Sequence, residues 1–276
     1  KLYEWAPGPV AHWDFDEGAG QGVYDKSGNG NDGTLGADSS AGSDDPQWTR
    51  GKYGKGLEFD WSAWENVQMP YNSELDFSGK EQITLAAWIK TTTEENGVQE
   101  VVGSLNDESG SNEAQLFIDN YGTTHGVCTY NIPGSDCDKA GLFDVNQWHH
   151  VAVTYNGSQK IFYRNGVVSK TESASGEIFV GNDGGVTGVA LGEGFQGAID
   201  DVKIYNYART QKQILEDMAA SAGASASRGA ALKQTVLSLD FDEGYGGTAH
   251  DESGHDNHGT LYPGVSGDNT ATSAMW

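Results

Sequence analysis

The stretch WHHVAVTYNGSQKIFYRNG, residues 148–166, carries the clearest fold signal in the chain. Apolar and polar residues alternate before Asn156-Gly157, and a run rich in aromatic and branched residues follows that pair. Asn-Gly pairs supply the positive φ values of a tight turn, which predicts a hairpin over Tyr155–Arg164 and a second turn at Asn165-Gly166. The stretch therefore indicates an antiparallel β-sheet.

Similar runs recur along the chain, including QITLAAWIK at 82–90, AQLFIDN at 114–120 and VALGEGFQGAIDDVKIYN at 189–206. Clusters of Asn, Gly, Asp and Ser separate them, as in an all-β protein with short loops. The alternation at Trp13, Trp88 and Trp148 predicts that these side chains face the core.

One helix is expected, in RTQKQILEDMAAS at 209–221. Thr210 and Gln213 have the spacing of a capping box, and Ile214, Leu215 and Met218 form a short apolar stripe. An Ala/Ser/Gly tract typical of a linker follows. These features predict an extension at 1–8, a domain at 9–219, a linker at 220–234 and a further segment at 235–276.

That last segment nearly repeats the opening of the chain. VAHWDFDEGAGQGVYDKSGNGNDGTL at 10–35 and VLSLDFDEGYGGTAHDESGHDNHGTL at 236–261 are identical at 14 of 26 positions without a gap. The segment 235–276 thus reads as the first strand and loop of a second copy. So few strands bury too little apolar surface to stay ordered alone.

The composition excludes several partners. Asp and Glu number 40 against 16 Lys and Arg, a formal net charge of -24, which would repel nucleic acid and anionic membranes. No window approaches 18 consecutive apolar residues, so no membrane insertion is expected. The chain begins at Lys1 without a signal peptide, as expected of a processed mature chain or an excised fragment.

The cysteines, Cys128 and Cys137, enclose a short loop that contains Pro133 and Gly134. A disulfide there would suit an oxidising compartment. Free thiols and a partial metal site are the alternatives, although two cysteines alone do not complete a tetrahedral zinc site.

The segment DKSGNGN is the most specific chemical feature. It presents Asp25, Ser27, Asn29 and Asn31 at alternate positions, separated by glycines that allow oxygen atoms to converge, as Ca²⁺ requires. An Asx-type turn without metal is the alternative, because Asn, Asp, Gly and Ser suit turns.

Five segments, in this order, resemble the laminin-G-like, concanavalin A-like jelly-roll domains common in bacterial and archaeal surface proteins. The segments are WDFDEGAGQGVYDKSGNGNDGTL at 13–35, GKYGKGLEFD at 51–60, ITLAAWIK at 83–90, WHHVAVTYNG at 148–157 and FQGAIDDVKIYNYART at 195–210. The resemblance implies a two-sheet antiparallel sandwich whose first and last strands are close together.

The resemblance also implies one structural calcium, bound by the loop, an acid of the first strand and the acid pair of the last strand. The residues that match are Asp16, Asp25, Asn29, Asn31, Asp200 and Asp201. In the second copy Asp242, Asp251 and Asn257 are the equivalents, a possible second metal loop.

Trp61 and Trp64, in FDWSAWENVQMP, are the candidates for a ligand-binding surface, because they fall where loop and strand character mix. Tryptophan faces stack well on sugars. Packing over the edge of the sandwich is the alternative role for both side chains.

No catalytic constellation is recognised. Glycosidases of this architecture need two carboxylates that flank the scissile bond, and Asp14 and Asp16 have suitable spacing, but Asp16 is expected to bind metal. His149 and His150 lack a Ser or Cys nucleophile nearby. We therefore expect a non-catalytic, extracellular binding or adhesion module for a glycan or a surface protein.

Two interpretations of the second copy stay open. In one, the chain is part of a longer tandem array of such domains. In the other, the segment 235–276 inserts into a neighbouring molecule, and the protein is the subunit of a filament that assembles head to tail.

Overall fold

The structure, a computed structural model, describes residues 7–36, 38–93, 97–104, 114–121, 124–134, 136–178, 188–226, 248–249 and 259–260. The chain divides into two units, Lys1–Ala222 and Gly223–Trp276. In the part of the chain that the structure describes, no helix combines the length and the apolar character needed to span a membrane.

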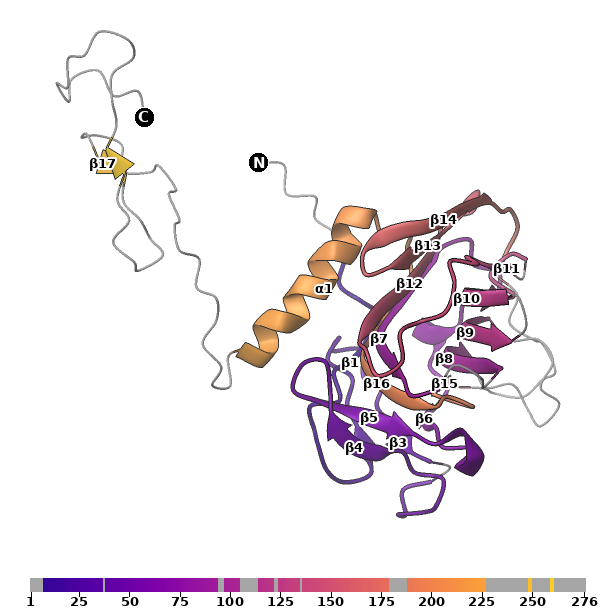
Figure 1. The fold of residues 1–276 in the computed structure, drawn as a ribbon, viewed down its shortest axis with the longest axis vertical. Coiled ribbons are helices and arrows are strands. Elements are labelled where there is room, and N and C mark those ends of the chain that lie inside the picture. Colours follow the sequence, from indigo (N-terminus) through magenta and orange to yellow (C-terminus); the bar gives the residue numbers. More distant parts are fainter. Residues whose placement is uncertain are drawn as a thin grey trace, which may run out of the picture. The chain divides into compact units, whose positions relative to one another are not determined.

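Two antiparallel sheets of eight strands each form a sandwich in the first unit (Figure 1). Sheet A has the order β14-β13-β12-β7-β16-β5-β4, and β1 also pairs with β16. Its strands are β1 (Ala11–Trp13), β4 (Gln47–Arg50), β5 (Lys55–Phe59), β7 (Ile83–Thr91), β12 (His149–Tyr155), β13 (Gln159–Arg164), β14 (Val167–Ser173) and β16 (Gly197–Tyr205).

Sheet B has the order β11-β10-β9-β8-β15-β6-β3-β2. Its strands are β2 (Gly22–Val23), β3 (Gly33–Leu35), β6 (Val67–Met69), β8 (Val98–Ser104), β9 (Gln115–Tyr121), β10 (Thr124–Tyr130), β11 (Asp136–Cys137) and β15 (Val189–Leu191). Two 3-10 helices, η1 (Trp61–Ala63) and η2 (Ser73–Leu75), flank β6. The predicted two-sheet jelly-roll class is confirmed.

Both predicted hairpins are present. Strands β12 and β13 pair from Tyr155 opposite Lys160, and in their turn Gly157 alone has a positive φ, of 90°. The turn from β13 to β14 has positive φ at both Asn165 (51°) and Gly166 (75°), the geometry that an Asn-Gly pair favours.

The core lies between the sheets. Trp13, Phe15, Leu57 and Phe162 are fully enclosed there. Trp88 is also buried, at 5% exposure, but on the outer face of sheet A, where Tyr53 and His150 contact it edge to face. Trp148 is half-buried, so its predicted core position is wrong. Sheet A is covered on both faces, and alternation along its strands therefore does not identify the core side.

Helix α1 (Gln211–Ala226) covers part of this outer face, where Ile214 packs on Ala86, Ala152 and Tyr163. The predicted capping box is present: Thr210 N donates to Gln213 Oε1 at 2.8 Å, and Gln213 N donates to Thr210 Oγ1 at 3.4 Å.

The helix departs from the sequence prediction in two respects. Leu215 of the predicted stripe is 47% exposed. The helix also continues to Ala226, into the tract assigned to a linker, because alanine has the highest helix propensity.

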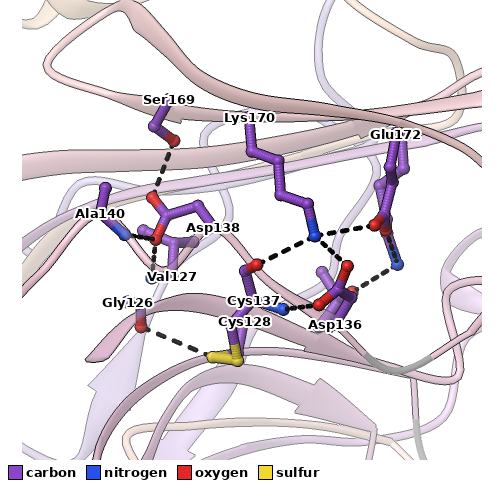
Figure 2. Close-up of a disulfide and its surroundings, with 12 residues drawn as sticks. Gly126, Val127, Cys128, Asp136, Cys137, Asp138, Ala140, Ser169, Lys170 and Glu172 are labelled. Carbon is purple, nitrogen blue, oxygen red and sulfur yellow. Dashed lines mark hydrogen bonds and ion pairs between the residues drawn. A yellow bond between two sulfur atoms is a disulfide. The ribbon is translucent and has the colours of Figure 1, made fainter. Parts of the chain in front are cut away.

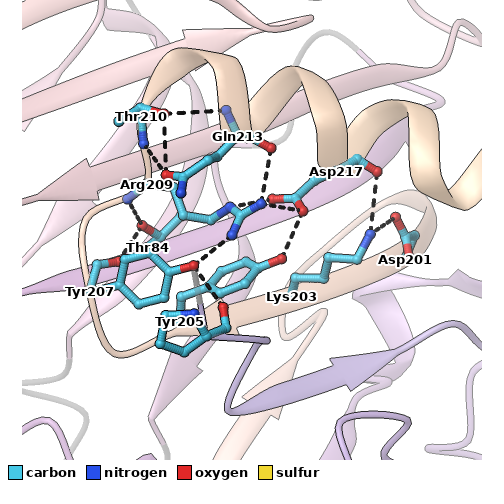
Figure 3. Close-up of polar contacts among 10 residues, drawn as sticks. Thr84, Asp201, Lys203, Tyr205, Tyr207, Arg209, Thr210, Gln213 and Asp217 are labelled. Atoms are coloured by element: carbon cyan, nitrogen blue, oxygen red, sulfur yellow. Dashed lines mark hydrogen bonds and ion pairs between the residues drawn. The ribbon is translucent and has the colours of Figure 1, made fainter. Parts of the chain in front are cut away.

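A buried polar network joins the helix to the last strand (Figure 3). Asp217 accepts hydrogen bonds from Arg209 Nη2 at 2.8 Å and Tyr205 Oη at 2.9 Å. Arg209 Nε is 2.7 Å from the second Asp217 oxygen. All three side chains are buried, so water has little access to the network and cannot readily replace a lost hydrogen-bond partner.

The second unit repeats a local structure of the first. Thr248 pairs with Thr260 and Ala249 with Gly259, in strands β17 (Thr248–Ala249) and β18 (Gly259–Thr260). In the first copy Gly22 pairs with Thr34 and Val23 with Gly33. The same register therefore recurs 226 positions later.

Asp217→Ala should lower the free energy of unfolding by about 3–5 kcal/mol, because it leaves the Arg209 charge buried without its partner. Urea denaturation measures the change. Glu216→Ala is the matched control: Glu216 is the neighbouring acid, 57% exposed at its side chain, and its loss should change stability by less than about 0.5 kcal/mol. Equal effects of both substitutions would contradict a structural role for the network.

His150 should make stability depend on pH. Burial, with a smaller contribution from the positive charge of Lys203, lowers the pKa of His150 to about 3, against an opposing effect of Asp201. An unfolded histidine titrates near pH 6.5. Between about pH 6.5 and 3 the unfolded chain therefore binds the extra proton, and the free energy of unfolding should fall as pH falls, by at most about 1.4 kcal/mol per unit.

His150→Gln should flatten this slope in urea denaturation curves recorded across that pH range. The control is His149→Gln, because His149 is next to His150 on β12 but only half-buried. This variant should keep the same slope as the parent protein. A slope unchanged by His150→Gln would show that other groups cause it.

Candidate functional site

The segment from Asp25 to Asn31 forms a closed loop around one carboxylate. Asp25 Oδ1 accepts hydrogen bonds from the backbone N–H groups of His12 (3.0 Å) and Ser27 (2.8 Å), and Oδ2 accepts from Asn31 N at 3.0 Å. Although partial burial opposes ionisation, these bonds and the Ser27 hydroxyl lower the pKa of Asp25. The Asx-type turn that the sequence left open is present, and it ties the loop to β1.

Three side chains of this loop converge on the carbonyl of Val10. Val10 O accepts from Asn29 Nδ2 at 3.0 Å and Asn31 Nδ2 at 2.8 Å, and it lies 3.1 Å from Ser27 Oγ. The Ser27 hydroxyl is also 2.7 Å from Asp25 Oδ2, and its single hydrogen satisfies only one of these acceptors. Asn31 Oδ1 is buried without a hydrogen-bond partner. Backbone or amide N–H groups thus satisfy Val10 O and both Asp25 oxygens, whereas the buried Asn31 Oδ1 lacks a donor.

The oxygen atoms of this loop are of the kinds that bind a hard cation. They include carboxylate, hydroxyl, amide and backbone oxygens, the ligand types that Ca²⁺ prefers. Asp25, Asn29 and Asn31 of the predicted set meet here, and both Asn amides donate to the carbonyl of Val10, which no side-chain pattern identifies.

The other predicted ligands have different partners. Asp16 Oδ1 accepts Lys55 N at 2.9 Å, and Asp200 Oδ2 accepts Tyr53 N at 3.0 Å. Both acids thus hold the turn that connects β4 to β5. Burial, reinforced by the neighbouring Asp201 charge and opposed by the Tyr53 N–H, raises the pKa of Asp200 to about 8.

Asp201 lies between the side chains of His12 and Lys203. Its Oδ1 is 2.7 Å from His12 Nε2, and its Oδ2 is 2.7 Å from Lys203 Nζ. Burial disfavours the Asp201 carboxylate, but the His12 hydrogen bond and the Lys203 charge outweigh it and lower its pKa. The residue has φ of 50°, at a register shift in the pairing of β16 with β7 between Asp200 and Lys203.

The predicted calcium set is thus divided into three groups around β1 and β16. His12 links two of them, because its N–H binds Asp25 and its ring binds Asp201. Asp242, Asp251 and Asn257 lie outside the described residues.

Trp61 and Trp64 are exposed, at 47% and 65%, on the segment that passes from β5 in sheet A to β6 in sheet B. Asp60 caps η1 by accepting Ser62 N at 2.9 Å, and Trp64 N donates to Trp61 O at 3.2 Å. Trp64 has left-handed backbone angles, φ 56° and ψ 34°, which cost free energy for a bulky residue.

Glu65 holds this segment in place. Its Oε2 accepts Asp60 N at 2.6 Å, and the side chain is buried. Burial raises the pKa of Glu65, as do the nearby charges of Asp60, Asp45 and Glu58 to a smaller extent. The two indoles therefore project from a fixed loop, and carboxylates lie beneath that loop. The sequence prediction omitted Glu65, because no spacing rule marks a carboxylate that binds a backbone five residues earlier.

The predicted disulfide is confirmed. Cys128 and Cys137 are bonded, and they are opposite one another in the pairing of β10 with β11 (Figure 2). Lys170 Nζ donates to Cys137 O at 3.1 Å, so sheet A contacts the disulfide-bonded hairpin.

The acids and histidines considered for catalysis have structural partners. Asp14 Oδ1 accepts Asp16 N at 3.2 Å. His149 Nε2 is 3.3 Å from Asp144 O, and the ring of His150 is buried against Trp88.

Two packed antiparallel sheets, with the first strand beside the last, define a jelly-roll domain of the concanavalin A type. The family model described as the concanavalin A-like lectin/glucanases superfamily matches residues 65–215, more than half of the chain, and the chain belongs to this family. No curated protein sequence matches it.

Several solved structures have a similar fold. Domain 4 of AbnA, a GH43 extracellular arabinanase from Geobacillus stearothermophilus, in complex with arabinotriose, has a TM-score of 0.59 and 20% identity, over 76% of this chain and 98% of that chain. The binding domain of Paraclostridial Mosquitocidal Protein 1 has a TM-score of 0.56 and 14% identity, over 76% and 51%.

Trypanosoma rangeli sialidase is a third such structure, with a TM-score of 0.53 and 14% identity over 76% of this chain and 32% of that chain. At these identities the likeness concerns the fold alone, and one fold serves many functions. This chain spans about half of the mosquitocidal binding domain and a third of the sialidase.

Proposed function

We propose that this domain is a non-catalytic, extracellular carbohydrate-binding module that contacts its ligand through Trp61 and Trp64. The observation that carries the proposal is the exposure of both indoles on a loop whose backbone is fixed by Asp60 and Glu65. Preorganised aromatic side chains lose little conformational entropy when a ligand stacks on them. The similarity to a domain in complex with arabinotriose supports a glycan as the ligand.

The negative charge around the loop limits the classes of glycan that can bind. The negative charges of Asp60, Asp45 and Glu58 all act on Glu65, and the whole chain carries a formal net charge of -24. Anionic sugars would be repelled, so the proposed ligand is a neutral glycan.

The proposal includes one structural calcium at the loop of Asp25, Asn29 and Asn31. Its support is the buried Asn31 Oδ1 without a partner, close to the Asp25 carboxylate and the Val10 carbonyl. A half-turn of the Asn31 amide would place its oxygen where the nitrogen now faces Val10 O, and a cation there would bind both oxygens. Asp16, Asp200 and Asp201 stay predicted members of the site.

Self-association through 235–276 stays a prediction. The hairpin β17–β18 supports a second copy of the opening segment, but β6, the partner of β3 in the first copy, is already paired on both sides by β3 and β15. An inserted hairpin would have to displace β2 and β3.

Calcium removal should lower the melting temperature, because a ligand that binds only the folded state stabilises it by mass action. At 1 mM calcium we expect a drop of several degrees when a chelator is added, recorded by scanning calorimetry. Asp25→Ala should abolish the calcium response. Asp38→Ala, at an exposed acid between β3 and β4, should preserve it. A melting temperature that chelation does not change would refute the site.

Trp61→Ala and Trp64→Ala should each weaken binding of a neutral oligosaccharide at least tenfold, because tryptophans that a ligand covers contribute much of the binding free energy. Isothermal titration with arabinotriose and a panel of neutral oligosaccharides measures the loss. Tyr71→Ala is the matched control, since Tyr71 is equally exposed, at 47%, and lies beyond β6. Unchanged affinity in both tryptophan variants would place the ligand elsewhere.

A further inference from the structure

One group of potential metal ligands meets in the described part of the chain, away from the calcium-type loop. A carboxylate oxygen of Asp119 and the sulfurs of Cys128 and Cys137 all lie within 4.8 Å of one another. Asp119 is opposite Gly126 in the pairing of β9 with β10, two residues before Cys128, and Cys137 is opposite Cys128. Three adjacent strands therefore bring one oxygen and two sulfurs together.

The oxidised protein uses both sulfurs in the disulfide. A phosphine reductant would convert it to two thiols, consuming one water and forming the phosphine oxide. We propose that the reduced hairpin binds one Zn²⁺ through Cys128, Cys137 and Asp119. Each thiol releases its proton on binding, and a water molecule completes four-coordination, as thiolate and carboxylate ligands with an open position allow for zinc.

The hairpin is held in place without the disulfide. Lys160 is fully buried, and its amine donates to Thr129 Oγ1 (3.0 Å) and to the carbonyls of Ile132 (3.1 Å), Pro133 (3.4 Å) and Gly134 (3.4 Å). These contacts fix the segment that connects the two cysteines. Reduction therefore leaves both thiols near each other, and little ordering entropy opposes metal binding.

A second clamp fixes the chain just after Cys137. Arg164 binds both oxygens of Asp138, with Nε at 2.7 Å and Nη2 at 2.8 Å. Asp138 also accepts Val127 N at 3.1 Å, so it joins β10 to the exit from β11. The strands that supply both sulfurs stay paired through this carboxylate.

Zn²⁺ with two thiolates and one carboxylate carries one net negative charge. Lys170 Nζ donates to Cys137 O at 3.1 Å and also pairs with Asp136 and Glu172, so its charge is shared with two carboxylates and is not counted toward zinc binding. Thiolates select zinc over calcium, so the two proposed metals use different sites and the zinc proposal does not depend on the calcium site.

The test begins with reduction of the whole chain by a phosphine, in calcium buffer, until thiol analysis finds both cysteines reduced. Zn²⁺ is then titrated into the reduced protein. We expect one Zn²⁺ per chain by isothermal titration, and sulfur-to-metal absorption when Co²⁺ replaces Zn²⁺. Asp119→Asn should weaken Zn²⁺ binding at least tenfold, whereas Asp144→Asn, an exposed acid, should not. The oxidised chain and the double variant Cys128→Ser, Cys137→Ser should give no sulfur-to-metal absorption.

Three results would overturn the proposal. One is reduced protein without sulfur-to-metal absorption, and another is Asp119→Asn protein that binds zinc as tightly as the parent chain. The third is loss of β circular dichroism on reduction before metal is added, because the Lys160 and Asp138 contacts should hold the hairpin.

Discussion

The first unit depends on how β16 is shared among its neighbours. This nine-residue strand is buried along its whole length and pairs with β7 on one side. On the other side β5 pairs with Gly197–Ile199 and β1 with Val202–Ile204. Two separate strands thus share one edge of β16, and the backbone between them must change register. The register shift falls at Asp200 and Asp201.

The two acids act at this junction on opposite neighbours. Asp200 binds the backbone of the turn that leads into β5, and Asp201 binds His12 of β1. A buried carboxylate needs such partners, and here the partners are the strands that the shift separates. The acid pair therefore has a structural role that does not require metal, and the proposed calcium adds to it at the loop beyond β1.

Much of this arrangement could be predicted from local sequence. The Asn-Gly turns, the Thr210-Gln213 cap and the Cys128–Cys137 pair each depend on residues close together in the chain. The calcium-type loop was also predictable as a turn, because its Asp, Asn and Gly spacing encodes the geometry directly.

Features made by distant segments were not predictable. Trp88 alternates like a core residue, but α1 and the turn before β5 cover the outer face of sheet A, so both faces are apolar. Lys160, in an ordinary strand position, is buried against the carbonyls of a remote loop. Glu65 binds Asp60 only because the chain reverses between them. Such contacts depend on tertiary proximity, which a periodicity does not encode.

The antiparallel pairing of β1 with β16 has a mechanical consequence. Val10 N donates to Ile204 O, and the pairing runs from Ala11 with Ile204 to Trp13 with Val202. The chain thus enters and leaves this ladder at the same end. A tensile load between the two ends of the domain would peel the strands apart one hydrogen bond at a time. Before that peeling begins, the load would act on the Tyr207 hydroxyl that donates to Pro7 O and on the buried Arg209–Asp217 pair that anchors the helix.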